Sequence, residues 1–247
     1  MRKPILLLGV LILLLPICLF AGPTEPEDVL RQADLKRGPW EKFTLNAQIF
    51  AEGKQDSYRV FFKNDTKTLV YFRTPAPAKG NLLLMLADQL WFYVKDTRTP
   101  IRITPLQRMA GSVSYGDVAR LSWSQDYAIV SMEEEAVQEV KAYKLELTAK
   151  SQGATYQRIT LWVSQDDDSP VMAKLYLLSG KHFKTLIFTE YKIVLGKKMN
   201  TQMKFIDHFK NNEESVLTFD KITVRDIPDR YFIKTALPEL PYAIEEE

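Results

Sequence analysis

The sequence has little cysteine, histidine and glycine, and it has no excess of charge of either sign. Cys18 is the only cysteine among 247 residues, and His182 and His208 are the only histidines, so a zinc site has almost no Cys or His ligands to use. The 33 basic residues nearly match the 31 acidic ones, whereas a protein that binds nucleic acid carries a basic excess. With 10 Gly, 13 Pro and 46% hydrophobic residues, the chain is neither collagen-like nor disordered. We therefore expect a globular protein with no cofactor, no metal and no nucleic-acid partner.

The N-terminal segment has the layout of an export signal. Arg2 and Lys3 precede an uncharged apolar run over residues 5–20, and small residues follow it. A positive start, a short apolar run and a small-residue end define a secretory signal peptide. The run of 16 residues is shorter than the roughly 20 that a membrane-spanning helix needs. We expect residues 1–21 to be a cleaved signal peptide and residues 22–247 to be a periplasmic protein; retention of the signal as an anchor is the alternative.

A further alternative for this segment is lipidation of Cys18. The order Leu15-Pro16-Ile17-Cys18 is similar to a lipobox, but Ile17 is bulky where a small residue normally precedes the lipidated cysteine. Removal of residues 1–21 leaves 226 residues with no cysteine and with 31 basic and 31 acidic side chains. Because no disulfide can form in that chain, an apolar core must hold it together, and its length is sufficient for one.

Short runs of β-forming residues dominate the chain after one helix. Residues 26–37 predict a helix, because acidic residues follow the first proline and Gly38-Pro39 ends the segment. From Trp40 onward, about eleven β-rich runs alternate with turn residues, which is typical of an antiparallel meander. Residues 105–124 break this pattern and predict a loop followed by a short helix, and residues 226–247 predict an extended or helical closing segment. No Pro/Gly/Ser-rich linker divides the chain, so we expect one domain.

Several of the predicted strands are apolar on both faces. The runs 82–86, 90–94 and 175–178 do not alternate between apolar and polar residues, as an antiparallel strand with one wet face does. Both faces of these strands therefore need a cover, which another sheet, the helices or a bound apolar ligand can supply. Two arrangements provide it: a curved sheet around an apolar interior that holds a ligand, or the packed core of a β-sandwich.

The motifs that carry a family resemblance lie between residues 80 and 118. They are a Gly-Asn-Leu-Leu-Leu strand, a Leu-Trp-Phe-Tyr strand, the basic segment Arg98–Ile103, and a Gly-Ser stretch that leads into Asp117-Val118. In this order and spacing they resemble the LolA-like outer-membrane lipoprotein-sorting proteins. The resemblance covers about residues 27–235, which is nearly the whole chain after the signal.

The resemblance implies a fold that is mainly β with few helices. It implies a half-open antiparallel β-barrel, here of about eleven strands, with a helical plug or lid and a cavity that holds acyl chains. The strand arginine of the well-studied carriers falls at Tyr71 in this sequence, and Arg73 lies two positions later, on the same strand face. This departure sets the chain apart from those carriers.

The apolar strands and the resemblance together suggest which side chains line such a cavity, although the sequence leaves the inward parity of each strand open. The expected lining residues are Tyr71, Leu83, Met85, Trp91, Tyr93, Tyr176 and Phe188. Three arginines, Arg73, Arg98 and Arg102, are candidates for contact with a head group or a partner protein.

The sequence contains only weak candidates for a catalytic site. Asp207 and His208 are adjacent and would point to opposite faces of a strand, and Ser179 and His182 lie in a predicted hairpin turn. No Gly-x-Ser-x-Gly motif is present. The run Asp166-Asp167-Asp168 lacks the glycine and distal glutamate of an EF-hand loop. We therefore expect a protein that is not an enzyme.

Two functions from different classes fit the sequence. The first is a monomeric periplasmic carrier that shields the acyl chains of a lipoprotein or other lipid, receives them from an inner-membrane transporter and passes them to an outer-membrane acceptor. Burial of acyl chains is favourable by about 0.8 kcal/mol per CH₂, so such a carrier needs a dry cavity. The second is an accessory or structural subunit of an export complex, with the barrel filled by its own side chains.

Overall fold

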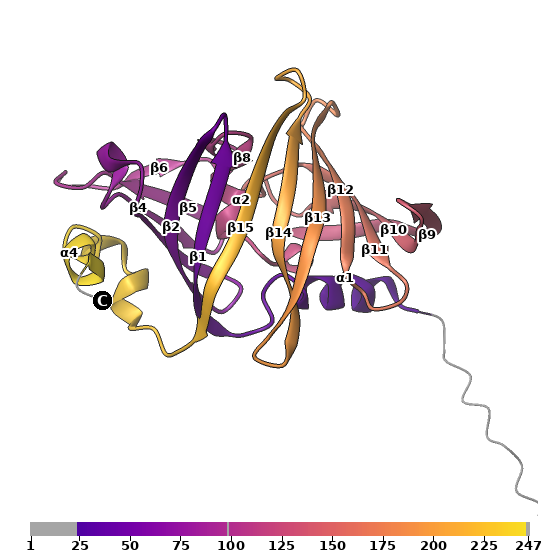
Figure 1. Cartoon of the computed structure of the whole chain (residues 1–247), viewed down its shortest axis with the longest axis horizontal. Coiled ribbons are helices and arrows are strands. Elements are labelled where there is room, and N and C mark those ends of the chain that lie inside the picture. Colours follow the sequence, from indigo (N-terminus) through magenta and orange to yellow (C-terminus); the bar gives the residue numbers. More distant parts are fainter. Residues whose placement is uncertain (1–23, 98, 246–247) are drawn as a thin grey trace, which may run out of the picture.

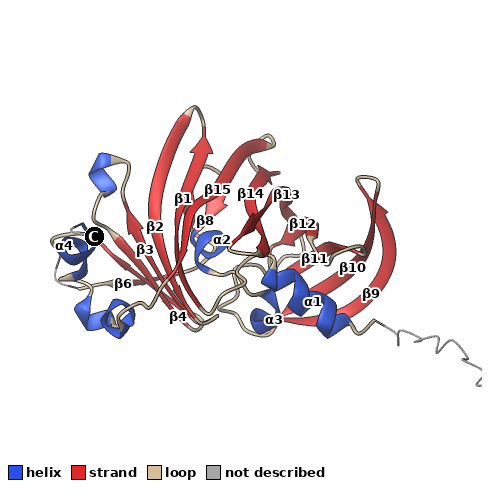
Figure 2. Ribbon diagram, turned by 60° about the horizontal axis from the view of Figure 1, so that its bottom comes forward, coloured by secondary structure: helices blue, strands red, loops and turns tan. Residues whose placement is uncertain are grey.

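The computed structural model describes residues 24–97 and 99–245. The expected signal peptide, with Cys18, and the candidate head-group residue Arg98 lie outside this range. The described residues form mainly one long, strongly curved antiparallel sheet, with three helices on its concave side and the C-terminal helical segment on its convex side (Figures 1 and 2). In the described part of the chain, no helix is long and apolar enough to cross a membrane.

Strands make up most of the molecule, and the helices are few and short. In chain order the strands are β1 (Lys42–Ala51), β2 (Lys54–Lys63), β3 (Lys67–Phe72), β4 (Leu82–Leu86), β5 (Gln89–Tyr93), β6 (Ile101–Ile103), β7 (Arg108–Ala110), β8 (Val113–Ser114), β9 (Tyr127–Val137), β10 (Val140–Ala149), β11 (Arg158–Ser164), β12 (Pro170–Tyr176), β13 (His182–Val194), β14 (Lys197–Asp207) and β15 (Glu213–Val224). The helices are α1 (Pro26–Leu35), α2 (Tyr115–Ala119), α3 (Trp123–Asp126) and α4 (Leu240–Glu245), with short 3₁₀ turns η1 (Ala76–Ala78), η2 (Asp229–Phe232) and η3 (Lys234–Ala236).

The sheet is open, because its two outermost strands do not pair with each other. Its strand order is β6-β5-β4-β3-β2-β1-β15-β14-β13-β12-β11-β10-β9, and every neighbouring pair is antiparallel. Most neighbours are consecutive hairpins, while β1 pairs with β15 and so joins the two halves of the chain. The mainly β architecture with few helices is confirmed. The expected eleven strands are not, since this sheet has thirteen strands and β7 and β8 form a second pair.

The main core lies between the concave face of the sheet and helices α1 to α3. Alternate residues of each strand point toward it, as in Leu45 of β1, Val70 of β3 and Leu83 of β4. From the other side, α1 contributes Val29, Leu30 and Ala33. The spacing of these helical residues places them on one face, so α1 packs lengthwise across the strands.

A second core lies on the convex face, where the C-terminal segment, residues 226–245, covers β2 to β5. Leu82, Leu84 and Tyr93 point outward into it and are buried by Tyr231 and Leu240 among others. The runs 82–86 and 90–94 thus have both faces covered largely by the chain itself, whereas in the run 175–178 only Leu175 is buried and Leu178 is exposed. The second cover is the C-terminal segment with its short helices η2, η3 and α4, and it is neither a ligand nor another sheet.

Two local expectations are refined by the structure. The helix expected over residues 26–37 ends at Leu35, and the segment that was expected to hold one short helix contains α2, α3 and the β7–β8 pair. A capping box explains the start of α2: Ser114 caps the helix, while Asp117 accepts a hydrogen bond of 2.8 Å from the Ser114 backbone N–H.

Candidate functional site

The concave side of the sheet is closed by residues 115–126, which we call the plug segment. It contains α2, the extended residues Arg120–Ser122 and α3. Figure 2 shows α3 beside α1, and α2 nearer the middle of the curved sheet. Both helices are only about one turn long, and helices of that length depend on their surroundings for stability.

Asp34, in the last turn of α1, attaches α3. Its carboxylate accepts hydrogen bonds from the backbone N–H groups of Trp123 at 2.7 Å and Ser124 at 2.8 Å, and from the Ser122 hydroxyl at 3.0 Å. Ser122 occupies the N-cap position of α3, but its own side chain does not cap the helix. Burial raises the pKa of the Asp34 carboxyl, and the Arg37 guanidinium opposes that rise.

Arg37, just after α1, attaches the extended part of the plug segment. Its Nη1 donates to the Leu121 carbonyl at 2.7 Å and its Nη2 to the Arg120 carbonyl at 3.2 Å, while its guanidinium carbon lies 4.0 Å from the centre of the Trp123 ring. Burial lowers the pKa of Arg37, and Asp34 counteracts this effect. One end of α1 therefore positions the whole second half of the plug segment.

A buried polar cluster attaches α2 to the strands. The Tyr156 hydroxyl donates to both carboxylate oxygens of Asp117, at 2.8 and 3.0 Å. The Nζ of Lys184, on β13, donates to the Ser114 hydroxyl at 2.7 Å and lies 3.7 Å from Asp117. Burial lowers the pKa of Lys184, and Asp117 opposes this. On the opposite side, the Thr68 hydroxyl of β3 donates to the Ala119 carbonyl at 2.8 Å.

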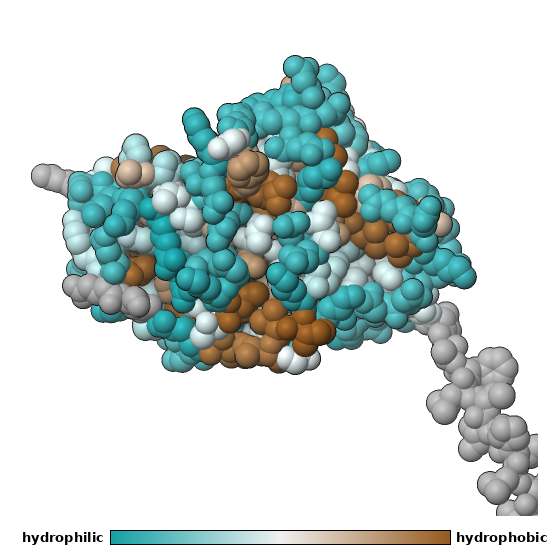
Figure 3. Space-filling model, in the orientation of Figure 1, coloured by the Kyte–Doolittle hydropathy of each residue, from teal (hydrophilic) through white to brown (hydrophobic). Residues whose placement is uncertain are grey.

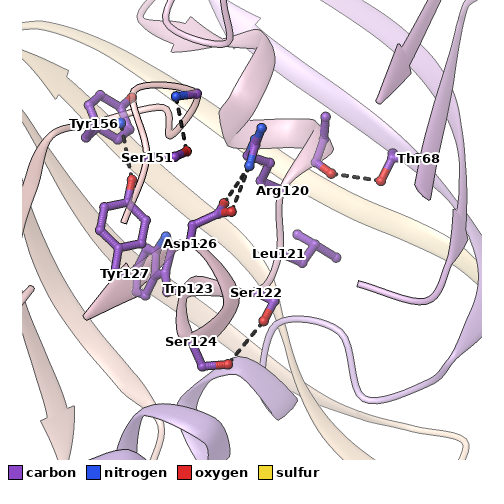
Figure 4. Close-up of polar contacts among 12 residues, drawn as sticks. Thr68, Arg120, Leu121, Ser122, Trp123, Ser124, Asp126, Tyr127, Ser151 and Tyr156 are labelled. Atoms are coloured by element: carbon purple, nitrogen blue, oxygen red, sulfur yellow. Dashed lines mark hydrogen bonds and ion pairs between the residues drawn. The ribbon is translucent and has the colours of Figure 1, made fainter. Parts of the chain in front are cut away.

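Within the plug segment, Arg120 pairs with Asp126. Figure 4 shows the two side chains facing each other, with Nη1 of Arg120 donating at 2.8 Å to each carboxylate oxygen. Nearby, the Tyr127 hydroxyl accepts a hydrogen bond from the Tyr156 backbone N–H at 3.2 Å. The segment is thus held by hydrogen bonds and one ion pair to the rest of the protein and also by apolar side chains, such as Val118 and Trp123, that are buried against the apolar sheet wall.

The interior is nearly full in this conformation. A cavity of about 10 Å³ lies between the plug segment and the strands, which is room for about one water molecule. Two surface pockets of about 270 and 280 Å³ lie outside the plug segment, and both are lined by Ser122 and Gln125. The larger spaces are therefore on the solvent side of the plug.

The structure does not bring the seven expected lining residues together. Leu83, Met85 and Phe188 lie in the main core on the concave side. The other four, Tyr71, Trp91, Tyr93 and Tyr176, lie elsewhere: the first three are in the convex-face cluster, and Tyr176 is half-buried beside His182 and Arg158. Strand alternation explains the division, because odd and even positions of one strand face opposite sides of the sheet.

The expected head-group arginines also lie apart from the plug segment. Arg73 follows β3, is exposed, and donates to Asn46 Oδ1 at 3.3 Å. Arg102 is exposed on the edge strand β6, opposite Trp91. The buried arginines are instead Arg37 and Arg120, which the sequence did not distinguish from surface residues. Their position beside glycine or small apolar residues, in Arg37-Gly38 and Ala119-Arg120, was the only signal available.

The two histidines form a pair at the ends of neighbouring strands. Their rings are 4.3 Å apart between centres, and the Thr185 hydroxyl lies 3.2 Å from His182 Nε2 and 2.9 Å from His208 Nε2. Asp207 is buried, while His208 bonds Asn212 at 2.7 Å. Among residues 24–97 and 99–245, no group of three or more His, Cys, Asp or Glu side chains is arranged to hold a metal.

Figure 3 shows that the face of the molecule seen in Figure 1 is mostly hydrophilic, with separate apolar areas rather than one broad apolar surface. Exposed apolar side chains occur at hairpins, as with Leu178, Ile193, Leu195 and Phe209. The extensive apolar surfaces of the protein are thus inside, on the two faces of the sheet.

Comparison with known proteins places this architecture in a family. A family described as an uncharacterized protein matches residues 64–239. The crystal structure of a LolA superfamily protein from Nitrosomonas europaea aligns with a TM-score of 0.79 and 32% sequence identity, covering 84% of this chain and 97% of that one. A search of curated proteins found no match.

Two more distant structures share the fold. A DUF1329 family protein from Desulfovibrio piger aligns at 22% identity and a TM-score of 0.72, over 85% of this chain and 97% of that one. A candidate outer membrane lipoprotein-sorting protein domain from Vibrio parahaemolyticus aligns at 16% identity and a TM-score of 0.72, over 86% of this chain and 97% of that one. With its curved open sheet and helical plug, the chain belongs to the LolA superfamily.

Proposed function

We propose that this protein is a periplasmic carrier that shields the acyl chains of a lipoprotein or another lipid. Residues 1–21 act as the cleaved signal, and residues 22–247 work as one monomeric domain without catalysis. An inner-membrane transporter supplies the cargo and an outer-membrane acceptor receives it. Intact mass of the exported protein tests the first step: a chain that begins at Gly22 is expected, and an acylated Cys18 would contradict it.

One observation carries the proposal: an apolar sheet wall is covered by a short plug segment that is attached through hydrogen bonds as well as through a few apolar side chains. When the plug segment moves away, water can replace its hydrogen bonds at little net cost, since an intramolecular hydrogen bond contributes only about 0.5–1.5 kcal/mol. Exposing the apolar wall costs more, about 25 cal/mol per Å². An acyl chain that takes the place of the plug segment removes that cost.

The closed interior is too small for cargo. Pockets that hold ligands of moderate size measure roughly 300–1,000 Å³, against about 10 Å³ beneath the plug segment. Binding of an acyl chain therefore requires displacement of residues 115–126. The filled interior also fits an accessory subunit whose barrel is permanently filled by its own side chains. Displacement of the plug segment is what distinguishes the carrier from such a subunit.

A disulfide across the plug tests this requirement. A Cβ built at Gly38 would lie 3.6 Å from the Cβ of Leu121, within the usual disulfide range of about 3.5–4.5 Å. We expect the oxidised Gly38→Cys/Leu121→Cys variant to bind a fluorescent fatty acid far more weakly than wild type, and reduction to restore binding. The mature chain has no other cysteine, and each single variant serves as a control.

Equal binding by the oxidised and reduced forms would contradict displacement of the plug segment. Native mass spectrometry of the purified wild type supplies the broader test. Co-purified acyl species support the carrier, whereas the absence of both co-purified lipid and probe binding favours the accessory subunit.

A further inference from the structure

Two buried arginines under the plug segment have N–H groups without partners. Arg120 is 6% exposed and uses only Nη1, for Asp126, so its Nε and Nη2 are unpaired. Arg37 is 4% exposed and uses Nη1 and Nη2, which leaves its Nε unpaired. A buried donor without an acceptor costs about 1–3 kcal/mol, and more when the group is charged. The fold therefore retains donors that it does not itself use.

The unpaired atoms of Arg120 have a specific geometry. In a guanidinium, Nε–H and the adjacent Nη2–H point in the same direction and form a fork that matches two oxygens of one carboxylate or phosphate. Because Asp126 occupies the Nη1 side, the fork formed by Nε and Nη2 is the free edge. An anion with two adjacent oxygens fits this edge, and a neutral hydroxyl or ester does not pair both donors.

The surroundings of this edge are amphipathic. Arg37 and Arg120 line the small internal cavity together with apolar residues of the main core, namely Leu175, Leu186, Met203 and Phe205. Arg120 also lines the surface pocket of about 270 Å³. Its side chain therefore stands between the solvent side and the apolar interior, where the polar end of a partly buried acyl lipid would lie.

The surroundings of the two arginines carry no net positive charge that could attract an anion. The buried and half-buried charged side chains nearby are balanced: Asp34, Asp117 and Asp126 against Arg37, Arg120 and Lys184. An incoming anion is thus recognised by hydrogen bonds from the fork and not by a positive field. Binding should consequently change little with ionic strength, unlike binding to an exposed basic patch.

We propose that the free edge of Arg120, assisted by the Nε of Arg37, binds the anionic head group of the carried lipid, a carboxylate or a phosphate. This inference rests on the proposed carrier function and narrows its cargo to acyl lipids with an ionised head. The cavity as it stands admits a water-sized group only, so the head group enters as the plug segment moves.

Paired probes test the proposal at pH 8. We expect cis-parinaric acid to bind wild type at least about tenfold more tightly than its methyl ester, since hydrogen bonds to charged groups contribute about 1.5–3 kcal/mol and 1.4 kcal/mol is a factor of ten. Lysophosphatidic acid against a monoacylglycerol of the same chain length forms the second pair, and it distinguishes a phosphate from a carboxylate. A preference for the charged member of either pair supports the proposal.

The variant Arg120→Lys keeps the charge and removes the fork. We expect it to bind the acid about tenfold more weakly while binding of the ester stays unchanged, and Arg158→Lys, on the outer face, to behave like wild type. Equal affinity of wild type for the charged and the neutral member of both pairs, or an equal loss of both members in Arg120→Lys, would overturn the head-group assignment and leave the carrier intact. If wild type binds no acyl probe, the carrier itself fails, and with it this inference. If Arg120→Lys does not fold, the comparison of charged and neutral probes on wild type tests the proposal by itself.

Discussion

Asp34 performs for α3 the role that a capping residue usually performs for its own helix. Its carboxylate accepts the N–H groups of Trp123 and Ser124 from a different helix. A helix of four residues cannot be stable by its own hydrogen bonds. The single carboxylate therefore couples the end of α1 to the start of α3.

Replacement of Asp34 by Ala should lower the free energy of unfolding by about 2 kcal/mol or more, because two backbone N–H groups and one hydroxyl lose their acceptor. Urea unfolding monitored by tryptophan fluorescence measures this. Asp28→Ala is the matched control on the same helix: Asp28 pairs only with exposed Arg31, and its loss should change stability by less than about 0.5 kcal/mol. Similar effects of the two substitutions would refute the capping role.

His182 should make the stability of the protein depend on pH. Burial, and then the neighbouring His208 and Lys174, lower the pKa of His182, while a hydrogen bond to the Lys184 carbonyl opposes this. A histidine with a lowered pKa in the folded state stabilises the protein above its unfolded pKa of about 6.5, and this contribution disappears as pH falls through the folded value.

We therefore expect the melting temperature of wild type to fall between pH 7.5 and pH 5 more than that of His182→Gln. Differential scanning calorimetry of both proteins across this range measures the difference. Parallel curves for the two proteins would show that His182 has no role in this dependence. Carboxylates act on both proteins alike, mainly at lower pH, so they cancel in the comparison.

Among the elements, α2 depends on a close approach to the strand side of the molecule. A Cβ built at Gly116 would lie 2.0 Å from Thr155 Oγ1 and 2.8 Å from its Cγ2. Ala normally stabilises a helix relative to Gly by about 1 kcal/mol. Here overpacking, which typically costs about 1–3 kcal/mol, opposes that gain.

Gly116→Ala should therefore destabilise the protein by about 1–2 kcal/mol, against the usual helical trend. The double variant Gly116→Ala/Thr155→Ala should recover part of the loss, because it removes the two closest contacts. Chemical denaturation of the single and double variants provides the comparison. A stabilising effect of Gly116→Ala alone would mean that α2 can move away from Thr155 without cost.

Local patterns predicted the elements better than they predicted which face each residue occupies. The helix at 26–35 follows from its acidic first turn and the Gly38-Pro39 stop, and the consecutive hairpins follow from turn residues and β-forming runs. The run Leu82–Leu86 shows the limit: it predicts a strand with two covered faces, but the cover of one face is the distant C-terminal segment. Tyr71 and Phe188 therefore lie on different sides of the sheet, although both belong to apolar runs.

The candidate site was harder to predict for the same reason. Arg37 and Arg120 are separated by 83 residues and meet only because α1 and the plug segment pack against each other. Their burial depends on contacts that no periodicity encodes. An isolated arginine in a short helical pattern reads as a surface residue, which is its commonest environment.

At the scale of the whole molecule, the C-terminal segment works as the outer cover of the first half of the sheet. Tyr231 packs edge-to-face on Phe61 with 5.2 Å between ring centres, and ion pairs such as Lys63–Asp229 at 2.6 Å border the contact. Since Phe61, Leu69 and Leu84 are fully buried in the cluster that this segment completes, it belongs to the folded unit and is not an appendage.

Phe232→Ala should cost about 3 kcal/mol or more, as large-to-small changes in a core do. Ile233→Ala is the matched neighbour, because Ile233 is 47% exposed whereas Phe232 is 5% exposed. Its effect should stay below about 0.5 kcal/mol. Unfolding of both variants in guanidinium chloride measures the difference. Equal losses in the free energy of unfolding would mean that Phe232 of the C-terminal segment is not packed against the sheet.

The open sheet leaves two strand edges, and each is protected against another copy of the chain. An unpaired edge offers a row of backbone N–H and C=O groups on which a further strand can form, leading to aggregates. Strand β6 has only three residues, while β9 carries Glu133, Glu134 and Glu135 and no basic residue along its eleven. A second copy of β9 approaching this edge would bring like charges together. Replacing the three glutamates by threonine should therefore make the protein scatter light at concentrations where wild type remains clear, while loss of the exposed ion pairs of Glu133 and Glu135 with Lys144 should change the stability of each molecule only slightly.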